Sequence, residues 1–116
     1  MVRYSDSLSL TFVALADPTR RDALERMANG SASVSELAAP HGMTVPGMMK
    51  HLAVLESAGL VHAEKDGRVR RCDLTAAPMR EASAYLARYR RLWDRRLARL
   101  DALVTEQHAT SREGSL

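Results

Sequence analysis

The chain has 116 residues, of which 46% are hydrophobic, and a net charge of +3 at pH 7. This length predicts one domain and leaves little room for an enzyme's pocket. No apolar run approaches the roughly 20 residues that cross a bilayer, and the first residues do not resemble a signal peptide. Cys72 is the only cysteine, which excludes an intrachain disulfide. We therefore expect a cytoplasmic, non-enzymatic protein without a membrane segment.

Two helices are predicted at the start of the chain. The first covers Leu8 to Ala16, with one apolar side made of Leu8, Phe12, Leu15 and Ala16. Asp17 is a preferred N-cap and Pro18 a preferred first helical residue, so a second helix begins there and ends near Asn29-Gly30. Arg20 and Arg21 oppose the dipole at its start, so they need a partner, either a carboxylate of the same subunit or a phosphate.

The next two helices are predicted to form a helix-turn-helix over residues 33–58. Ser33 to Glu36 is a capping box for a short helix. Thr44 caps the following helix, which has Pro46 in its first turn and ends at Ala58-Gly59. The buried side of this second helix is predicted to be Met48, Leu52 and Leu55. A short helix, a tight turn and a second helix are typical of this motif.

A basic hairpin, or wing, is predicted over residues 60–74. Leu60 to Glu64 and Val69 to Leu74 have the character of strands, and the turn Lys65 to Arg68 between them contains Asp-Gly, a strong hairpin signal. Two strands suffice for this sheet. Strand alternation places Arg68 and Arg70 on one face. A basic edge strand protected from aggregation is the alternative explanation for these charges.

A long helix is predicted over residues 78–107, followed by a disordered tail at 109–116. Its apolar residues recur at spacings of three and four, which is the period of a coiled coil: Met79, Ala82, Leu86, Tyr89, Trp93, Leu97, Leu100 and Val104. One narrow stripe on so long a helix needs a partner. Part of it can pack on the first helix, and the remainder can pack on a second copy of the chain.

This order of elements resembles the ArsR/SmtB family of bacterial winged-helix regulators. The resemblance is carried by Leu15 to Leu24, Ser33 to Ala38, Met49 to Val61 and Asp66 to Leu74, together with the Trp-containing final helix. It implies a mainly α (α+β) fold, with one winged helix-turn-helix domain over residues 1–108. It also implies a homodimeric transcriptional repressor that binds an inverted repeat in double-stranded DNA.

The predicted DNA-binding residues lie on the second helix of the motif and on the wing. An α-helix entering the major groove presents its N-terminal residues to base edges. Here these are Thr44, Val45, Pro46 and Met49, followed by Lys50 and His51 near phosphates. Lys65, Arg68 and Arg70 of the wing are expected at the backbone or a minor groove. Members of the family often carry Gln, Arg or Ser where Val45, Gly47 and Met49 stand, so we expect weak base readout and more reliance on DNA shape.

The predicted dimer interface combines the first helix with the long one. Its residues are Phe12, Met79, Leu86, Tyr89, Trp93, Leu97 and Leu100. Such a dimer places two recognition helices in successive major grooves of the operator. A module that only binds proteins through the long helix is a further hypothesis, and it predicts no DNA binding.

A metal- or redox-responsive sensor of the same fold is the alternative function. The resemblance implies metal ligands on the third helix or the final helices, but residues 35–38 contain no thiol. Asp101 and His108 are two turns apart on the last helix and provide half a zinc site at most. Cys72 is expected to be a small buried residue, and His41 and His62 to be isolated on the surface. No metal or cofactor is therefore predicted, and the effector is unknown.

Overall fold

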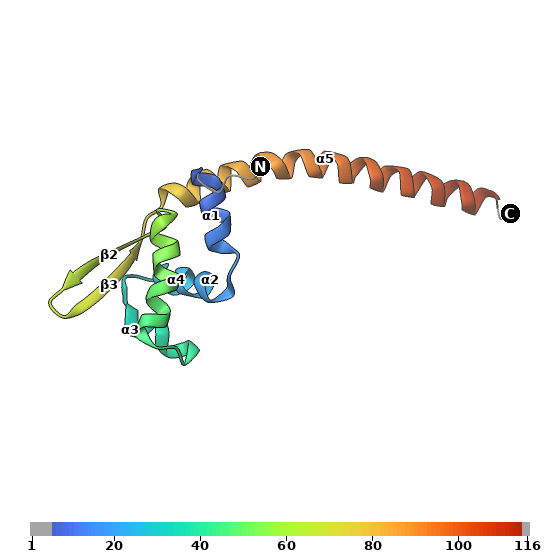
Figure 1. Ribbon diagram of the computed structural model, residues 1–116. Helices are drawn as coiled ribbons and strands as arrows, with labels where there is room; N and C mark the ends of the chain where they lie inside the picture. Colours follow the sequence, from blue (N-terminus) through green and yellow to red (C-terminus); the bar gives the residue numbers. More distant parts are fainter. Residues whose placement is uncertain (1–5, 115–116) are drawn as a thin grey trace. The chain divides into compact units, whose positions relative to one another are not determined.

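The computed structural model describes the backbone of residues 6–114 and the side chains of residues 6–107. The chain divides into two compact units, Met1–Ala82 and Ser83–Leu116, which we call the body and the arm. The body contains these elements: α1 (Ser7–Leu15), α2 (Pro18–Met27), β1 (Ala32–Ser33), α3 (Val34–Ala38), the short 3-10 helix η1 (Ala39–His41), α4 (Val45–Ser57), β2 (Val61–Asp66), β3 (Val69–Leu74) and the start of α5 (Ala77–Gly114) (Figure 1). The expected mainly helical fold with a hairpin wing and a long final helix is confirmed.

Side-chain caps begin the body's helices where the sequence predicts them. The Asp17 carboxylate accepts from the Arg20 backbone N–H at 3.0 Å. Ser33 and Glu36 form the reciprocal capping box of α3. The Thr44 hydroxyl oxygen accepts from the Gly47 N–H at 3.1 Å. Because each cap satisfies an N–H that the helix leaves without a partner, these starts are fixed locally.

The sheet has three strands in the order β1-β3-β2, so the predicted pair of strands is incomplete. The two residues of β1 pair with Cys72 and Arg71 on the free edge of β3. Strands are predicted from alternating apolar and polar residues, and two residues are too few to show such alternation.

The hairpin turn is shorter than predicted. Asp66 pairs with Val69, so only Gly67 and Arg68 lie between the strands. Gly67 has φ +65 and occupies the first turn position, as a type II′ turn requires. Asp66 therefore ends β2 instead of belonging to the turn.

The buried face of α1 differs from the predicted apolar side. Thr11 and Ala14 are buried, whereas Phe12 is half-buried and Ala16 is exposed. The Thr11 hydroxyl donates to the Ser7 carbonyl at 3.0 Å. This bond satisfies the hydroxyl within the helix, so its burial costs little. The spacing of apolar residues therefore predicted a buried face of α1 that is rotated by about one residue from the observed one.

The core lies between α4, the shorter helices and the sheet. Its largest fully buried side chains are Met27, Leu37, Met48, Leu55, Leu60, Thr11 and Cys72. Met48, Leu52 and Leu55 form the buried side of α4, as predicted. Cys72 is completely buried, which confirms its expected place. Ala82, the last residue of the body, is also buried.

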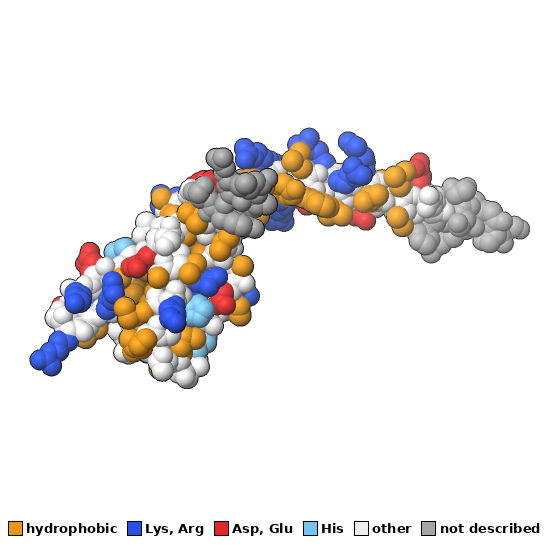
Figure 2. Space-filling view, in the orientation of Figure 1, with side chains coloured by type: hydrophobic (Ala, Val, Ile, Leu, Met, Phe, Trp, Pro, Cys, Tyr) orange, Lys and Arg blue, Asp and Glu red, His pale blue; other side chains and the backbone are white. Residues whose placement is uncertain are grey.

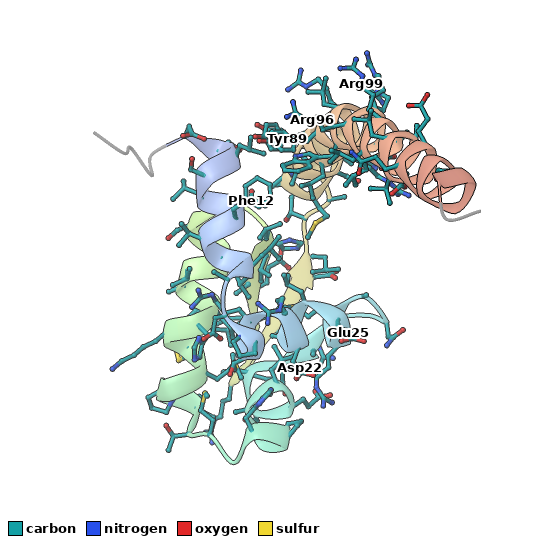
Figure 3. All side chains as sticks on the ribbon, turned by 90° about the vertical axis from the view of Figure 1, so that its right-hand side faces the viewer. Phe12, Asp22, Glu25, Tyr89, Arg96 and Arg99 are labelled. Atoms are coloured by element: carbon teal, nitrogen blue, oxygen red, sulfur yellow. The ribbon has the colours of Figure 1, made fainter. Side chains whose placement is uncertain are left out.

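The arm is one helix with an exposed apolar stripe. The predicted stripe residues Leu86, Tyr89, Trp93, Leu97, Leu100 and Val104 are about half exposed, and so are Leu92 and Leu103, which were not predicted. Figure 3 shows Tyr89, Arg96 and Arg99 projecting from α5. The helix continues to Gly114, beyond the predicted end at residue 107. The last two positions of the predicted tail lie outside the described residues. No helix within residues 6–114 is long and apolar enough to span a membrane.

Candidate nucleic-acid interface

The N-terminal half of α4 presents the predicted base-reading residues to solvent. Thr44, Val45, Pro46 and Met49 are all exposed, and so is Lys50. Met48, which lies between them in the sequence, is buried completely. The first turns of α4 therefore have one side in the core and the other in solvent. This surface is mainly apolar, and its only charged member is the lysine.

Gly47 explains part of this apolar character. A Cβ atom at this position would lie 3.0 Å from Cγ of Met43 and 3.1 Å from Oγ1 of Thr44. The second of these atoms is the one that caps α4. Any side chain at position 47, polar ones included, would therefore crowd the cap of the helix that carries it.

The wing places its basic side chains in different directions. Lys65 and Arg68 are exposed at the hairpin tip, where Lys and Arg side chains gather in Figure 2. Arg71 turns to the other side of the sheet, where its guanidinium lies 4.0 Å from the Glu36 carboxylate and donates to the Ser31 carbonyl at 3.4 Å. Of the basic side chains of the wing, those of Lys65 and Arg68 therefore lie at the tip.

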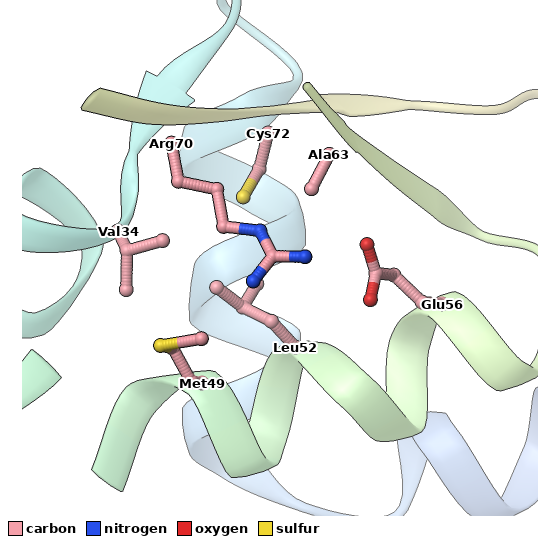
Figure 4. Close-up of a pocket in the computed structure, with 7 residues that line it drawn as sticks. All are labelled: Val34, Met49, Leu52, Glu56, Ala63, Arg70 and Cys72. Atoms are coloured by element: carbon pink, nitrogen blue, oxygen red, sulfur yellow. The ribbon is translucent and has the colours of Figure 1, made fainter. Parts of the chain in front are cut away.

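Arg70 lies on the helix-facing side of β3. It lines a small gap between β3 and α4 together with Val34, Met49, Leu52, Glu56, Ala63 and Cys72. Figure 4 shows its guanidinium pointing toward the Glu56 carboxylate of α4. Arg70 remains solvent-exposed, but its side chain covers α4, whereas Arg68 belongs to the turn. The prediction that Arg68 and Arg70 share one strand face is therefore wrong.

Burial sets the chemistry of the cysteine beside this gap. It raises the pKa of the Cys72 thiol, and the negative charge of Glu56 raises it further. Reactive cysteines have a lowered pKa and are accessible. Cys72 therefore has the properties of a packed side chain.

His51 faces α2, although the sequence placed it near phosphates. Its Nδ1 lies 3.6 Å from the Asp17 carboxylate and 3.5 Å from Nη1 of Arg20. The pKa of Asp17 is lowered mainly by the hydrogen bond from the Arg20 backbone, with a further contribution from the charge of His51. His51 thus joins α4 to the start of α2.

The guanidinium groups of Arg20 and Arg21 bind backbone carbonyls of the same chain, and not the carboxylate that was one of the two expected partners. Arg20 donates to Ala14 at 2.7 Å and to Val13 at 3.0 Å, and Arg21 donates to Leu15 at 2.7 Å. These acceptors are at the C-terminal end of α1, where the last carbonyls have no i+4 partner within the helix and cations are favoured; the Val13 carbonyl also accepts from the Ala16 N–H at 3.2 Å. The sequence contained a signal for this arrangement, because α1 ends at Leu15, a few residues before the two arginines.

The other histidines lie on the surface, as the sequence suggested, but each has a polar partner and is not isolated. His41 Nε2 lies 2.7 Å from the Asp22 carboxylate, which also accepts from Arg26 at 2.7 Å. Both contacts lower the pKa of Asp22, and the bond from Arg26 has the larger effect. His62 Nδ1 is 3.2 Å from the Thr75 hydroxyl.

The half-site considered at Asp101 and His108 stays a hypothesis. Within the described side chains, no three His, Cys, Asp or Glu residues come together in a way that could hold a metal ion. Asp101 is exposed on α5. His108, its predicted companion, lies outside the described side chains.

A helix-turn-helix followed by a β-hairpin defines a winged helix-turn-helix protein. A family model described as a helix-turn-helix domain matches residues 15–64. A crystal structure of an ArsR family transcriptional regulator is 45% identical in sequence and has a TM-score of 0.71. The match covers 81% of this chain and 97% of that one. The chain belongs to the ArsR family of transcriptional regulators, and its relatives are regulators, not enzymes.

Two further relatives have informative descriptions. A solution NMR structure from Mycobacterium bovis, of a homodimeric winged helix-turn-helix DNA-binding domain, is 25% identical with a TM-score of 0.58, over 79% of this chain and 82% of that one. A probable mercury resistance operon repressor of Streptomyces lividans is 34% identical over 65 residues, which are 56% of this chain and 52% of the repressor. The matches span about half the length of the curated relatives.

Proposed function

We propose that the chain binds double-stranded DNA as a homodimer in the cytoplasm and represses transcription from an inverted-repeat operator. The observation that carries the proposal is the exposed N-terminal half of α4, which the body supports through Met48, Leu52 and Leu55. The major groove is about 12 Å wide and admits one such helix. Because the chain belongs to a family of transcriptional regulators, double-stranded DNA is the expected partner of its helix-turn-helix.

Within this proposal, α4 and the wing have separate tasks. Thr44, Val45, Pro46 and Met49 face base edges, and Lys50 faces a phosphate. Lys65 and Arg68 at the wing tip provide further phosphate contacts, because both are exposed and neither forms an ion pair with another described side chain. Arg70 is a weaker candidate than at the sequence level, since its guanidinium covers α4. His51 is directed toward α2 and contributes indirectly.

Base recognition by this helix is limited by its chemistry. Val45 and Met49 can contact thymine methyl groups but cannot form the paired hydrogen bonds that distinguish guanine or adenine. We infer that specificity depends more on sequence-dependent DNA shape and on the spacing of two half-sites. Substituting one base pair of a half-site should then cost less than changing the spacing between half-sites.

The arm supports the dimer. Its apolar residues are about half exposed in the single chain, and contiguous apolar surface of this kind marks interaction sites. The M. bovis relative is described as homodimeric. We propose that Met79, Leu86, Tyr89, Trp93, Leu97 and Leu100 meet a second copy, together with Phe12 of α1. Leu92 and Leu103 widen this face beyond the predicted set.

Fluorescence anisotropy with duplexes from the gene's own promoter tests the proposal. We expect tight binding of an inverted repeat by two chains, weaker binding to a scrambled duplex, and an affinity that falls steeply with salt as counterions are released. Reporter expression should rise when the gene is deleted. Salt-insensitive binding, or no binding to any duplex, would overturn the proposal.

A metal-dependent form of this repressor remains a separate hypothesis. The S. lividans relative is described as a probable mercury resistance repressor, and Asp101 and His108 are the residues that the sequence offers. Titration of the DNA complex with zinc and with mercuric ion, for wild type and D101N, tests it. Unchanged DNA affinity with either metal would reject metal sensing.

A further inference from the structure

Arg20 touches three helices at once. It stands in the first turn of α2, and its guanidinium donates to the Ala14 and Val13 carbonyls of α1 at 2.7 and 3.0 Å. Its Nη1 also lies 3.5 Å from Nδ1 of His51, on α4. The same residue's backbone N–H binds the Asp17 carboxylate at 3.0 Å. One side chain therefore connects the end of α1 with the helix that carries the DNA-facing residues.

The geometry suits arginine in particular. A planar guanidinium presents several donors in a fixed fork, so it can bind two carbonyls and still direct a nitrogen elsewhere. The last carbonyls of α1 have no i+4 partner within the helix, although that of Val13 also accepts from the Ala16 N–H at 3.2 Å, and a cation there is stabilised by the helix dipole. A lysine in this place would keep the charge but could not reach all of these partners simultaneously.

We propose that Arg20 is a positioning residue for DNA recognition, acting through His51, and that it does not itself bind a phosphate. This inference rests on the proposed DNA-binding function. His51 lies one turn after Pro46 and Gly47, so restraining it restrains the end of α4 that faces the bases. Because α1 carries Phe12, the same link connects the proposed dimer face with the recognition helix.

Arg21 is a matched control within the chain. It is the next residue, has the same charge, and donates to the neighbouring Leu15 carbonyl at 2.7 Å. Within the described part of the chain, Arg21 forms no hydrogen bond or ion pair with α4. A general effect of charge or of α1 capping should therefore appear in both R20Q and R21Q, whereas positioning of α4 should be affected only by R20Q.

The experiment compares R20Q, R20K, R21Q, H51Q and R20Q/H51Q with wild type by anisotropy on operator and scrambled duplexes at several salt concentrations. We expect R20Q and R20K to bind the operator roughly tenfold more weakly, as for the removal of a hydrogen bond to a charged group. R21Q should stay near wild type. The salt slope should be unchanged in every variant, and R20Q/H51Q should be no weaker than R20Q because the two residues form one link.

Three results would overturn the inference. A salt slope that falls by about 0.9 for each Arg20 removed means a phosphate contact. Equal losses of affinity in R20Q and R21Q mean a charge effect, and fully additive losses in R20Q/H51Q mean that the residues act independently. If R20Q does not fold, R20K and H51Q still make the comparison.

Hydrogen exchange separates this inference from the proposed function. Amides at the start of α4 should exchange faster in R20Q than in wild type or R21Q, with or without DNA. If the wild type binds no DNA, the proposed function fails, yet the exchange experiment still decides whether Arg20 restrains α4. Unchanged exchange in R20Q would reject the link.

Discussion

The body and the arm treat their apolar residues in opposite ways. The body buries Met27, Leu37, Met48, Leu55 and Leu60 almost completely, whereas the arm leaves Leu86, Trp93, Leu97 and their neighbours about half exposed. The body therefore contains the packing that determines its own fold. The apolar surface of the arm is exposed in the single chain, and we propose that a second copy of the chain covers it.

The body and the arm also differ in the kind of contact that stabilises them. In the body, caps and carbonyl-binding arginines join helices that are distant in the sequence, as Arg20 does for α1 and α4. In the arm, neighbours on one helix contact each other, such as Arg90 and Asp94 at 3.6 Å and the rings of Tyr85 and Tyr89. Substitutions in the two units should therefore have different consequences.

The largest effect is expected from L97E in the arm. A carboxylate in the apolar stripe opposes burial against a second copy. The dimer should dissociate, and operator affinity should fall by about 10²–10⁴-fold because the half-sites are no longer bound together. Sedimentation and anisotropy measure the two effects. A98E adds the same charge on another side of the helix and should remain dimeric. Dimeric L97E would contradict the proposed use of the stripe.

L55A in the body should destabilise the fold itself. Leu55 is fully buried, and removing such a side chain costs about 2–5 kcal/mol of unfolding free energy. Urea denaturation at a protein concentration where the chain is monomeric measures this loss. L103A, in the arm, should change the monomer by less than about 0.5 kcal/mol. Similar losses in both variants would remove the distinction between body and arm.

The wing is expected to affect DNA binding without affecting either fold or dimer. K65Q/R68Q should reduce the salt slope of operator binding by about 0.9 for each phosphate that is no longer neutralised. R70Q, with the same kind of substitution, should leave the slope unchanged because its guanidinium covers α4. If R70Q also reduces the slope by about 0.9, Arg70 reaches the DNA and our placement of it is wrong.

The smallest effect concerns pH and the cap of α2. The pKa of Asp17 is lowered in the folded chain, first by the Arg20 backbone N–H. A lowered folded-state pKa adds stability above the unfolded value near 4 and loses it as pH falls through the folded value. D17N keeps a capping side chain that does not titrate. Its melting temperature should therefore fall less than that of the wild type as pH drops below about 4. An identical pH profile would contradict this role of Asp17.

Local features of this fold could be predicted from the sequence, because they depend on a few adjacent residues. The caps at Asp17, Ser33 and Thr44 and the buried side of α4 belong to this group. The strand β1 could not be predicted, since two residues have no period. The partners of Arg20 and His41 depend on which elements become neighbours, and helical spacing does not contain that information.

Arg70 is an intermediate case. Cys72 was expected to be buried, and residues two apart on a strand share a face. These two statements together place Arg70 toward α4, as the structure does. Pairing Arg70 with Arg68 instead requires Arg68 to belong to the strand. Strand β3 begins at Val69, as predicted, so Arg68 lies in the turn and outside the strand.

The apolar stripe of α5 has a consequence for the shape of the proposed pairing. Its spacing is not a strict heptad, because Trp93 and Leu97 are four apart where three would be expected. Instead, the pattern repeats after eighteen positions, from Met79 to Leu97 and from Leu86 to Val104. This interval is about five turns at roughly 3.6 residues a turn. A straight helix therefore keeps the stripe on one side, and two copies could lie together without the left-handed winding that a seven-residue repeat imposes.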